Sequence, residues 1–244
     1  MEVLGVIPSR MGAVRFPGKP LADLAGRPLV QWVYEAAAAC PRLDRVVVAT
    51  PDQEIADVVR RFGGEAVLTS PLHPTGTDRV AEVAASTSAD VVVNVQGDQP
   101  FVTPEMLEHL VAPFALGQDV LMSTVGAPLG PLVDPEDGNV VKVVCDRNGD
   151  ALYFSRAPIP YYRTPGPAPV LHHLGLYAFT KAFLGVYQTL APTPLELCEG
   201  LEQLRVLEHG YRIRVARTDA PAIEVNTPAD LVAAIAHAGT LASS

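Results

Sequence analysis

The chain has little basic charge and few cysteines, and both shortages narrow the possible classes of function. Only 18 of its 244 residues are lysine or arginine, against 27 acids, so the formal net charge is −9. Such an acidic chain is a poor general binder of DNA or RNA, and we expect no nucleic-acid partner. The three cysteines (Cys40, Cys145 and Cys198) are far apart and form no Cys-x-x-Cys. That spacing favours reduced thiols and a cytoplasmic protein over disulfides or a zinc site.

Several other features are absent. No apolar run approaches the ~20 residues of a membrane span, and the first residues lack a secretory signal, so no membrane insertion is expected. No Gly-x-Gly-x-x-Gly follows the first apolar run, which argues against a dehydrogenase. No Gly-x-Ser-x-Gly is present, which argues against a serine-nucleophile hydrolase. With 48% hydrophobic residues, residues 1–244 can still form a single α/β domain.

What is present is a concentration of basic residues near the start. The segment 7–21 follows an apolar run, Val3–Ile7, and carries Arg10, Arg15 and Lys19 without any acid. Glycines in such a loop let backbone N–H groups approach an anion, while arginine and lysine neutralise it. The segment therefore predicts a site for a small polyphosphate. The alternative is that these are ordinary solvated loop charges.

Strand-like and helix-like segments alternate through the first half of the chain. Strands are predicted at 3–7, 45–50, 66–68 and 91–96, and helices at 28–40, 52–62, 78–86 and from 103. This alternation predicts a mainly parallel sheet covered by helices on both faces. Ligands bind beyond the carboxyl ends of such strands. The basic loop, Thr75–Arg79 and Gly97-Asp98 all follow predicted strands, so we expect them to converge on one edge.

The pattern changes after residue 125. Strands are predicted at 140–144, 151–154, 174–179 and 212–215, with helices at 195–209 and from 227. The first two strands flank Arg147-Asn148-Gly149, a hairpin signal. We interpret about 128–172 as an insertion of β-hairpin and loop rather than as an independent domain.

Five motifs of the chain occur together in a specific order. They are the basic loop, His73–Arg79, Asn94–Pro100, His173–Tyr177 and Leu201–Arg205. This order resembles the 3-deoxy-manno-octulosonate (Kdo) cytidylyltransferases, whose openings look like Ile-Pro-Ala-Arg…Arg-x-Pro-Gly-Lys-Pro-Leu, and the resemblance extends from about 3 to 235. Related sugar nucleotidyltransferases share the Pro-Gly-Lys-Pro-Leu loop. Asn-Val-Gln-Gly-Asp combined with Tyr153-Phe154-Ser155-Arg156 and Leu-Glu-Gln-Leu-Arg is much more specific.

The resemblance implies a fold and a reaction. The fold is a Rossmann-like nucleotidyltransferase fold, and the partners are CTP and an acidic 2-keto-3-deoxy sugar. The anomeric hydroxyl of Kdo attacks the α-phosphorus of CTP, which yields CMP-Kdo and pyrophosphate with Mg²⁺ as cofactor, for lipopolysaccharide-type envelope synthesis. Such transfer needs charge neutralisation and alignment more than covalent help. The resemblance also implies a homodimer, with 128–172 as a small subdomain for dimerisation and sugar binding.

The resemblance assigns roles to individual residues. The implied catalytic residues are Arg10, Arg15, Lys19 and Asp98. The implied nucleotide-binding residues are Pro8, Ser9, Arg10, Lys19, Thr75, Gly76, Thr77, Arg79, Gln96 and Asp98. The implied sugar-binding residues are Gln96, Arg156, His173, Tyr177, Glu202 and Gln203, with Arg156 facing the sugar carboxylate. The implied metal ligands are Asp98 and Asn226.

One of these positions departs from the family pattern. Relatives usually read Gly-Val-Asp-Thr-Pro-x-Asp-Leu, and this chain has Asn226 where they have the aspartate. An amide oxygen ligates magnesium without bringing negative charge, so the site is expected to be weaker. Glu224 lies two residues away and, in an extended segment, points to the same face. It is the candidate replacement carboxylate.

Alternatives remain open at the level of the sequence. Another keto-acid sugar, 8-amino-Kdo or a sialic acid, shares the reacting end of Kdo, and the loop 161–169 is a candidate for tuning that choice. A non-catalytic CTP sensor is a second alternative. Single residues also have structural explanations: Asp98 as a turn cap, Arg156 as the partner of a local acid, His173 and Tyr177 as core, and Glu202 as a surface charge.

Overall fold

The computed structural model describes the whole chain except residues 13–14, 117–118, 131–132, 165–169, 221–222 and 242–244. The chain divides into two compact units. Unit 1 consists of Met1–Glu108 together with Ala222–Ser244, and unit 2 of His109–Pro221. The insertion predicted at about 128–172 falls within unit 2, and its role as a subdomain stays a prediction.

Unit 1 contains a run of four parallel strands. Its strands are β1 (Val3–Pro8), β4 (Arg45–Thr50), β5 (Ala66–Leu68) and β6 (Val91–Asn94), in the order β6-β1-β4-β5. Val6 of β1 pairs with Val47 on one side and with Asn94 on the other. The central strands are continuous apolar runs because both of their faces are covered, as in other parallel sheets. The four predicted strands and their parallel arrangement are confirmed.

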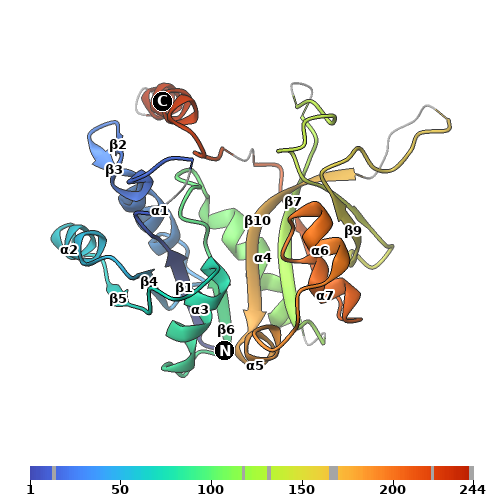
Figure 1. Ribbon diagram of the computed structural model, residues 1–244, viewed down its shortest axis with the longest axis horizontal. Coiled ribbons are helices and arrows are strands. Elements are labelled where there is room, and N and C mark those ends of the chain that lie inside the picture. Colours follow the sequence, from blue (N-terminus) through green and yellow to red (C-terminus); the bar gives the residue numbers. More distant parts are fainter. Residues whose placement is uncertain (13–14, 117–118, 131–132, 165–169, 221–222, 242–244) are drawn as a thin grey trace. The chain divides into compact units, whose positions relative to one another are not determined.

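Several helices complete unit 1 (Figure 1). They are α1 (Leu29–Ala38), α2 (Gln53–Arg61), α3 (Gly76–Ala85), α8 (Pro228–Leu241) and the first part of α4 (Pro104–Ala115). A single 3₁₀ turn, η1 (Lys19–Leu21), and a two-stranded ribbon, β2 (Asp23–Leu24) with β3 (Arg27–Pro28), precede α1. Thr75 and Asp78 form a reciprocal capping box at the start of α3. None of the helices in the described ranges is long and apolar enough to cross a bilayer.

Unit 2 is built on a mixed sheet. Its strands are β7 (Met122–Pro128), β8 (Lys142–Cys145), β9 (Ala151–Ser155), β10 (Val170–Thr180) and β11 (Arg214–Arg217), in the order β11-β7-β10-β8-β9. Only β11 and β7 are parallel. The predicted hairpin is confirmed as β8 and β9, which lie next to β10. Strand β7 and helix α5 (Lys181–Tyr187) have no counterpart in the sequence prediction.

The single helix predicted at 195–209 is wrong. The structure has two short helices, α6 (Pro194–Glu199) and α7 (Leu204–Glu208), visible beside β9 in Figure 1. Gly200 ends α6 in the left-handed region, at φ 63°, a conformation that costs glycine nothing. Its N–H donates to the carbonyl of Glu196 at 2.7 Å. As a result Glu202 and Gln203 lie on a turn between helices and not on a helix face.

Candidate functional site

Three loops of unit 1 meet at the carboxyl ends of its strands, as the alternation of elements predicts. A Cβ built on Gly97 would lie 2.9 Å from the carbonyl oxygen of Pro8 and 3.1 Å from Oγ of Ser9. A Cβ built on Gly76 would lie 3.3 Å from Cγ of Pro8. The loop after β6 therefore packs on the backbone of Pro8 and the start of α3 packs on its ring, and glycine at 97 and 76 leaves room for both approaches.

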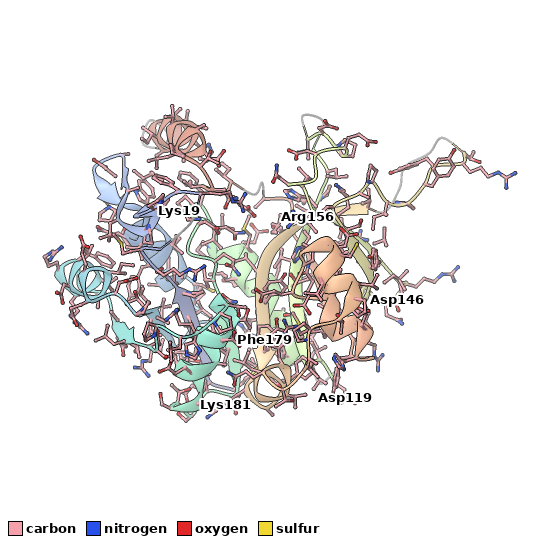
Figure 2. All side chains as sticks on the ribbon, viewed as in Figure 1. Lys19, Asp119, Asp146, Arg156, Phe179 and Lys181 are labelled. Carbon is pink, nitrogen blue, oxygen red and sulfur yellow. The ribbon has the colours of Figure 1, made fainter. Side chains whose placement is uncertain are left out.

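The basic loop places its three cations differently. Lys19, labelled in Figure 2, donates from Nζ to Oδ2 of Asp98 at 3.1 Å, and both side chains are mostly buried. Arg10 and Arg15 are exposed. Met11 anchors the loop, since its N–H donates to Asp52 and its carbonyl accepts from Gly18 N–H at 3.0 Å. The loop thus has one cation fixed by an ion pair and two exposed cations, whose contact with a phosphate stays a prediction.

Asp98 belongs to a cluster of side chains whose oxygen atoms could ligate a metal ion. Val225 N–H donates to the Asp98 carbonyl at 2.8 Å, which joins the segment before α8 to the loop after β6. Glu224 accepts from Nδ2 of Asn226 at 3.0 Å and from Nε2 of Gln99 at 3.3 Å. Burial, followed by the nearby Asp98 carboxylate, raises the pKa of Glu224. The prediction that Glu224 and Asn226 share a face is confirmed.

Two carboxylates and an amide oxygen form a hard-donor set that suits Mg²⁺, which typically takes one or two protein carboxylates and completes its shell with water and phosphate. The described residues contain no group of three His, Cys, Asp or Glu side chains arranged to hold a metal. The donor set is therefore consistent with a cation shared with a phosphorylated substrate, and not with one enclosed by protein alone.

Arg79 is a predicted nucleotide ligand that the structure uses internally. It is only 3% exposed, and Nη1 donates to the hydroxyl of Thr69 and, at 3.0 Å, to the carbonyl of Ser70. Burial, and then the positive charge of Arg10, lower the pKa of Arg79. Its position next to Arg10 adds positive potential to the loop, while its guanidinium holds the chain between β5 and α3.

Two polar atoms near the loops that follow β1, β5 and β6 are buried and have no hydrogen-bond partner within the described chain. They are Oγ of Ser9 and Oδ1 of Asn94, whose residues are 5% and 0% exposed. Such orphan groups are rare in proteins and cost about 1–3 kcal/mol each. Thr77 is also buried and Gln96 is half-buried. The residues predicted to bind the nucleotide thus lie, within unit 1, along the loops that follow β1, β5 and β6.

In unit 2 Arg156 is fixed by backbone carbonyls. At the end of β9 (Figure 2), it donates from Nε to Glu199 at 2.7 Å, from Nη1 to Gly138 at 2.8 Å and from Nη2 to Gly200 at 3.4 Å. These bonds use three of the five guanidinium N–H groups. Its contact with a sugar carboxylate stays a prediction. In the structure Arg156 also binds the carbonyls at the end of α6.

Glu199 and Lys142 complete this junction, and sequence reasoning missed both. The Glu199 carboxylate accepts from the Ser155 hydroxyl at 2.7 Å and from Arg156 N–H at 2.9 Å. Lys142 is 1% exposed and donates to the carbonyls of Asp137 and Arg156. Burial lowers the pKa of Lys142. A lysine inside an apolar strand pattern, one of only three in the chain, was the available signal.

His173 and Tyr177 lie on β10, on either side of an irregularity in its pairing with β7. Their rings are 5.4 Å apart, and Phe154 and Phe179 extend the row at 4.9 Å and 6.2 Å. Burial, and then His172, lower the pKa of His173 to about 3. Its Nε2 lies 2.9 Å from the Thr124 hydroxyl. The ring is therefore neutral, and its environment is compatible with both a core role and a ligand role.

Glu202 and Gln203 occupy the turn between α6 and α7. Tyr187 donates its hydroxyl to Oε2 of Glu202 at 3.3 Å, and burial followed by that carboxylate raises the pKa of Tyr187. Gln203 is 3% exposed, and its Nε2 has no partner within the described chain. Arg205 forms an ion pair with Glu196 beneath the turn. This turn thus offers an oriented carboxylate and an unsatisfied amide.

Comparisons with known proteins agree with this geometry. The sequence profile of the cytidylyltransferase family matches residues 4–213. A 3-deoxy-manno-octulosonate cytidylyltransferase of Acaryochloris marina is 61% identical, with 96% of each chain covered, and one of Synechococcus elongatus is 53% identical, with 98% covered. A solved CMP:2-keto-3-deoxy-manno-octonic acid synthetase in complex with CTP is 37% identical and superimposes with a TM-score of 0.94, covering 98% of this chain and 99% of the other.

Proposed function

Because the chain belongs to the cytidylyltransferase family, and within it to the 3-deoxy-manno-octulosonate cytidylyltransferases, we propose that it transfers CMP from CTP to Kdo and releases pyrophosphate. The observation that carries most weight is the likeness to the CTP-bound synthetase over nearly the whole of both chains. The loops that follow β1, β5 and β6 supply the second support, since they gather cations, unpartnered buried polar atoms and oxygen ligands at the carboxyl ends of parallel strands.

The basic loop performs the electrostatic part of the reaction. Arg10 and Arg15, which are exposed, are proposed to meet the β- and γ-phosphates, and Lys19, which is paired with Asp98, is proposed to meet the α-phosphate. As the bond from the α-phosphorus to the bridging oxygen breaks, negative charge accumulates on the departing pyrophosphate. One well-placed cation at such a position typically lowers the barrier by about 3–4 kcal/mol.

Magnesium is the proposed cofactor, and its proposed ligands are Asp98 and Asn226 with Glu224 as the nearby carboxylate. The support is the chemistry of the set, which consists of hard oxygen atoms. Gln99 and Asn226 donate to the Glu224 carboxylate, and Lys19 donates to Asp98. When bound, the ion neutralises phosphate charge. The chain's own contribution is to hold these oxygens near Lys19.

The proposed acceptor-binding residues are Gln96 of unit 1 and, separately, several side chains of unit 2. A keto-acid sugar offers one carboxylate and several hydroxyls. Glu202, held by Tyr187, accepts from hydroxyls, while the orphan amide of Gln203 donates. His173, Tyr177 and Arg156 are proposed to complete the set. Of the loop 161–169, proposed to tune the choice of sugar, residues 165–169 lie outside the described chain.

Pyrophosphate release tests this function. We expect release with CTP and Kdo, and slower release with 8-amino-Kdo or sialic acid. If pyrophosphate release is faster with 8-amino-Kdo or sialic acid than with Kdo, that sugar is the acceptor and Kdo is not. Binding of CTP without release, across the whole panel, would favour the alternative of a non-catalytic CTP sensor.

We also propose a cytoplasmic homodimer, whose interface includes part of 128–172. The support is apolar side chains that unit 2 leaves in solvent: Leu152, Tyr161 and Leu197 are 62%, 91% and 73% exposed. Light scattering after gel filtration should give twice the chain mass of 25.9 kDa. A monomer mass at micromolar concentration would contradict the proposal.

A further inference from the structure

Strand β10 contains a bulge between two proposed sugar ligands. The four steps from His173 to Tyr177 on β10 lie opposite only two steps on β7, from Gly126 to Thr124. Gly175, inside the bulge, has φ 67°, a conformation that favours glycine. The extra residues leave the pairing with β7 at this point.

Thr124 contacts the bulge from the neighbouring strand. It lies on β7 and is fully buried, and its hydroxyl donates to the carbonyl of Leu176, inside the bulge, at 2.6 Å. A hydroxyl has one proton, and a carbonyl only accepts. In its 2.9 Å contact with His173 the same oxygen must therefore accept, so Nε2 of His173 carries the ring proton.

The other ring nitrogen then has a defined role. A neutral imidazole protonated on Nε2 keeps a lone pair on Nδ1, which accepts hydrogen bonds and cannot donate. No side chain or backbone group in the described part of the chain bonds to Nδ1 of His173. Burial also keeps the ring neutral, because it lowers the pKa of His173 to about 3.

We propose that Thr124 is a positioning residue for the acceptor sugar. It pins the bulge of β10 and holds His173 as the Nε2–H tautomer, so that Nδ1 accepts a hydrogen bond from a sugar hydroxyl. This step rests on the proposed function. It also excludes the carboxylate of the sugar as the partner of His173, because a lone pair and a carboxylate oxygen repel each other.

Three variants isolate the hydroxyl. Thr124→Val removes it while nearly preserving the shape of the side chain, and Thr124→Ser restores it. Ser123→Ala is the matched control, because Ser123 is the preceding residue of β7, is equally buried, and donates to the carbonyl of Leu110 at 2.6 Å without touching His173. Thermal melts of all three verify that each variant folds.

The first readout is the ¹⁵N NMR spectrum of the imidazole, with His173→Gln used to assign the signals. We expect Nε2–H in the parent, in Thr124→Ser and in Ser123→Ala, and a mixture of tautomers in Thr124→Val. An Nδ1–H ring in the parent would overturn the proposal, as would an unchanged spectrum in Thr124→Val.

The second readout is kinetic. In Thr124→Val the KM for Kdo should rise about tenfold, with the KM for CTP unchanged, as expected for one lost hydrogen bond. Thr124→Ser should recover most of the affinity. An unmoved KM for Kdo, despite a changed spectrum, would overturn the hydroxyl contact. Failure of the proposed function itself would show separately, as absence of turnover in the parent.

Discussion

At the scale of the residue, Gly97 is required by the space around it rather than by its backbone angle. The nearest atom to a built Cβ is the Pro8 carbonyl oxygen, at 2.9 Å. A backbone atom cannot yield as the end of a side chain does. Any side chain at 97 must therefore separate the loops that carry Ser9 and Asp98.

Gly97→Ala should lower kcat/KM for CTP by about 100-fold, because displacements of about 1 Å in an active site have effects of this size. Steady-state pyrophosphate release measures it. Gly185→Ala is the control, since nothing lies within 4 Å of its built Cβ. That exposed helical position should keep parent activity and become more stable by up to about 1 kcal/mol. Parent-like activity in Gly97→Ala would contradict the packing argument.

Asn226 is the residue at which this chain differs from the family pattern. Asn226→Asp adds a carboxylate beside Glu224, to which the amide now donates at 3.0 Å. We expect the magnesium concentration for half-maximal activity to fall severalfold, because carboxylates hold hard cations better than amides do. Magnesium titrations of the parent, Asn226→Asp and Glu224→Gln test this. Equal magnesium dependence in the parent and Asn226→Asp would rule it out.

His173 makes stability depend on pH. Its pKa falls from 6.5 to about 3 in the folded protein, so between those values the unfolded chain binds more protons. The free energy of unfolding should therefore decrease as pH falls from about 6.5 towards 3. Urea unfolding at pH 7.5 and pH 5 measures the decrease, and His173→Gln should reduce it. An equal decrease in that variant would assign the effect to other groups.

At the scale of the element, the junction between β9 and α6 positions the turn that follows. The Glu199 carboxylate accepts from Ser155 and Arg156, while the Arg156 guanidinium returns to the carbonyls of Glu199 and Gly200. These reciprocal bonds fix where α6 ends. They therefore fix where Glu202 and Gln203 begin the next turn.

Glu199→Ala should destabilise the protein by about 1–3 kcal/mol, because it leaves the Ser155 hydroxyl and the Arg156 N–H without an acceptor. The KM for Kdo should rise as the turn loosens, while the KM for CTP stays constant. Thermal unfolding and two-substrate kinetics measure the two effects. Glu54→Ala, at an exposed position of α2, is the control and should lie within about 0.5 kcal/mol of the parent.

At the scale of the whole molecule, the proposed phosphate and metal residues belong to unit 1, while the proposed sugar residues other than Gln96 belong to unit 2. The chain has a net charge of −9, whereas the basic loop carries three cations and no acid. Each unit contributes its own strands and its own hydrogen bonds to its part of the proposed chemistry. The two binding functions should therefore separate on mutation.

Lys19→Met should weaken CTP binding by at least about tenfold, because a charge-assisted contact to phosphate is lost. Gln203→Ala should leave the Kd for CTP within about twofold and raise the KM for Kdo. Calorimetric titration with CTP and kinetics with varied Kdo give the two constants. A comparable loss of CTP affinity in both variants would mean that the functions do not separate.

The sequence alone predicted the parallel strands of unit 1, the hairpin and the basic loop, because these depend on local patterns. Apolar runs and glycine punctuation repeat within a few residues and can be recognised without knowing the fold. The helix predicted at 195–209 failed for the opposite reason. The apolar spacing of this segment predicts a continuous helix despite Gly200. In the structure the left-handed conformation of Gly200 ends α6, and the contacts of Glu199 and Arg156 hold the break in place.

By itself, then, the sequence determined the family, the nature of the phosphate loop and the departure at Asn226, since these are properties of residue identity and order. The tertiary structure alone decided which groups support that chemistry. Thr124, Tyr187 and Glu199 have no motif, because a hydroxyl or carboxylate acquires its role only from partners that lie far away in the chain. Hydrogen bonding depends on distance and direction in space, and the order of residues does not contain them.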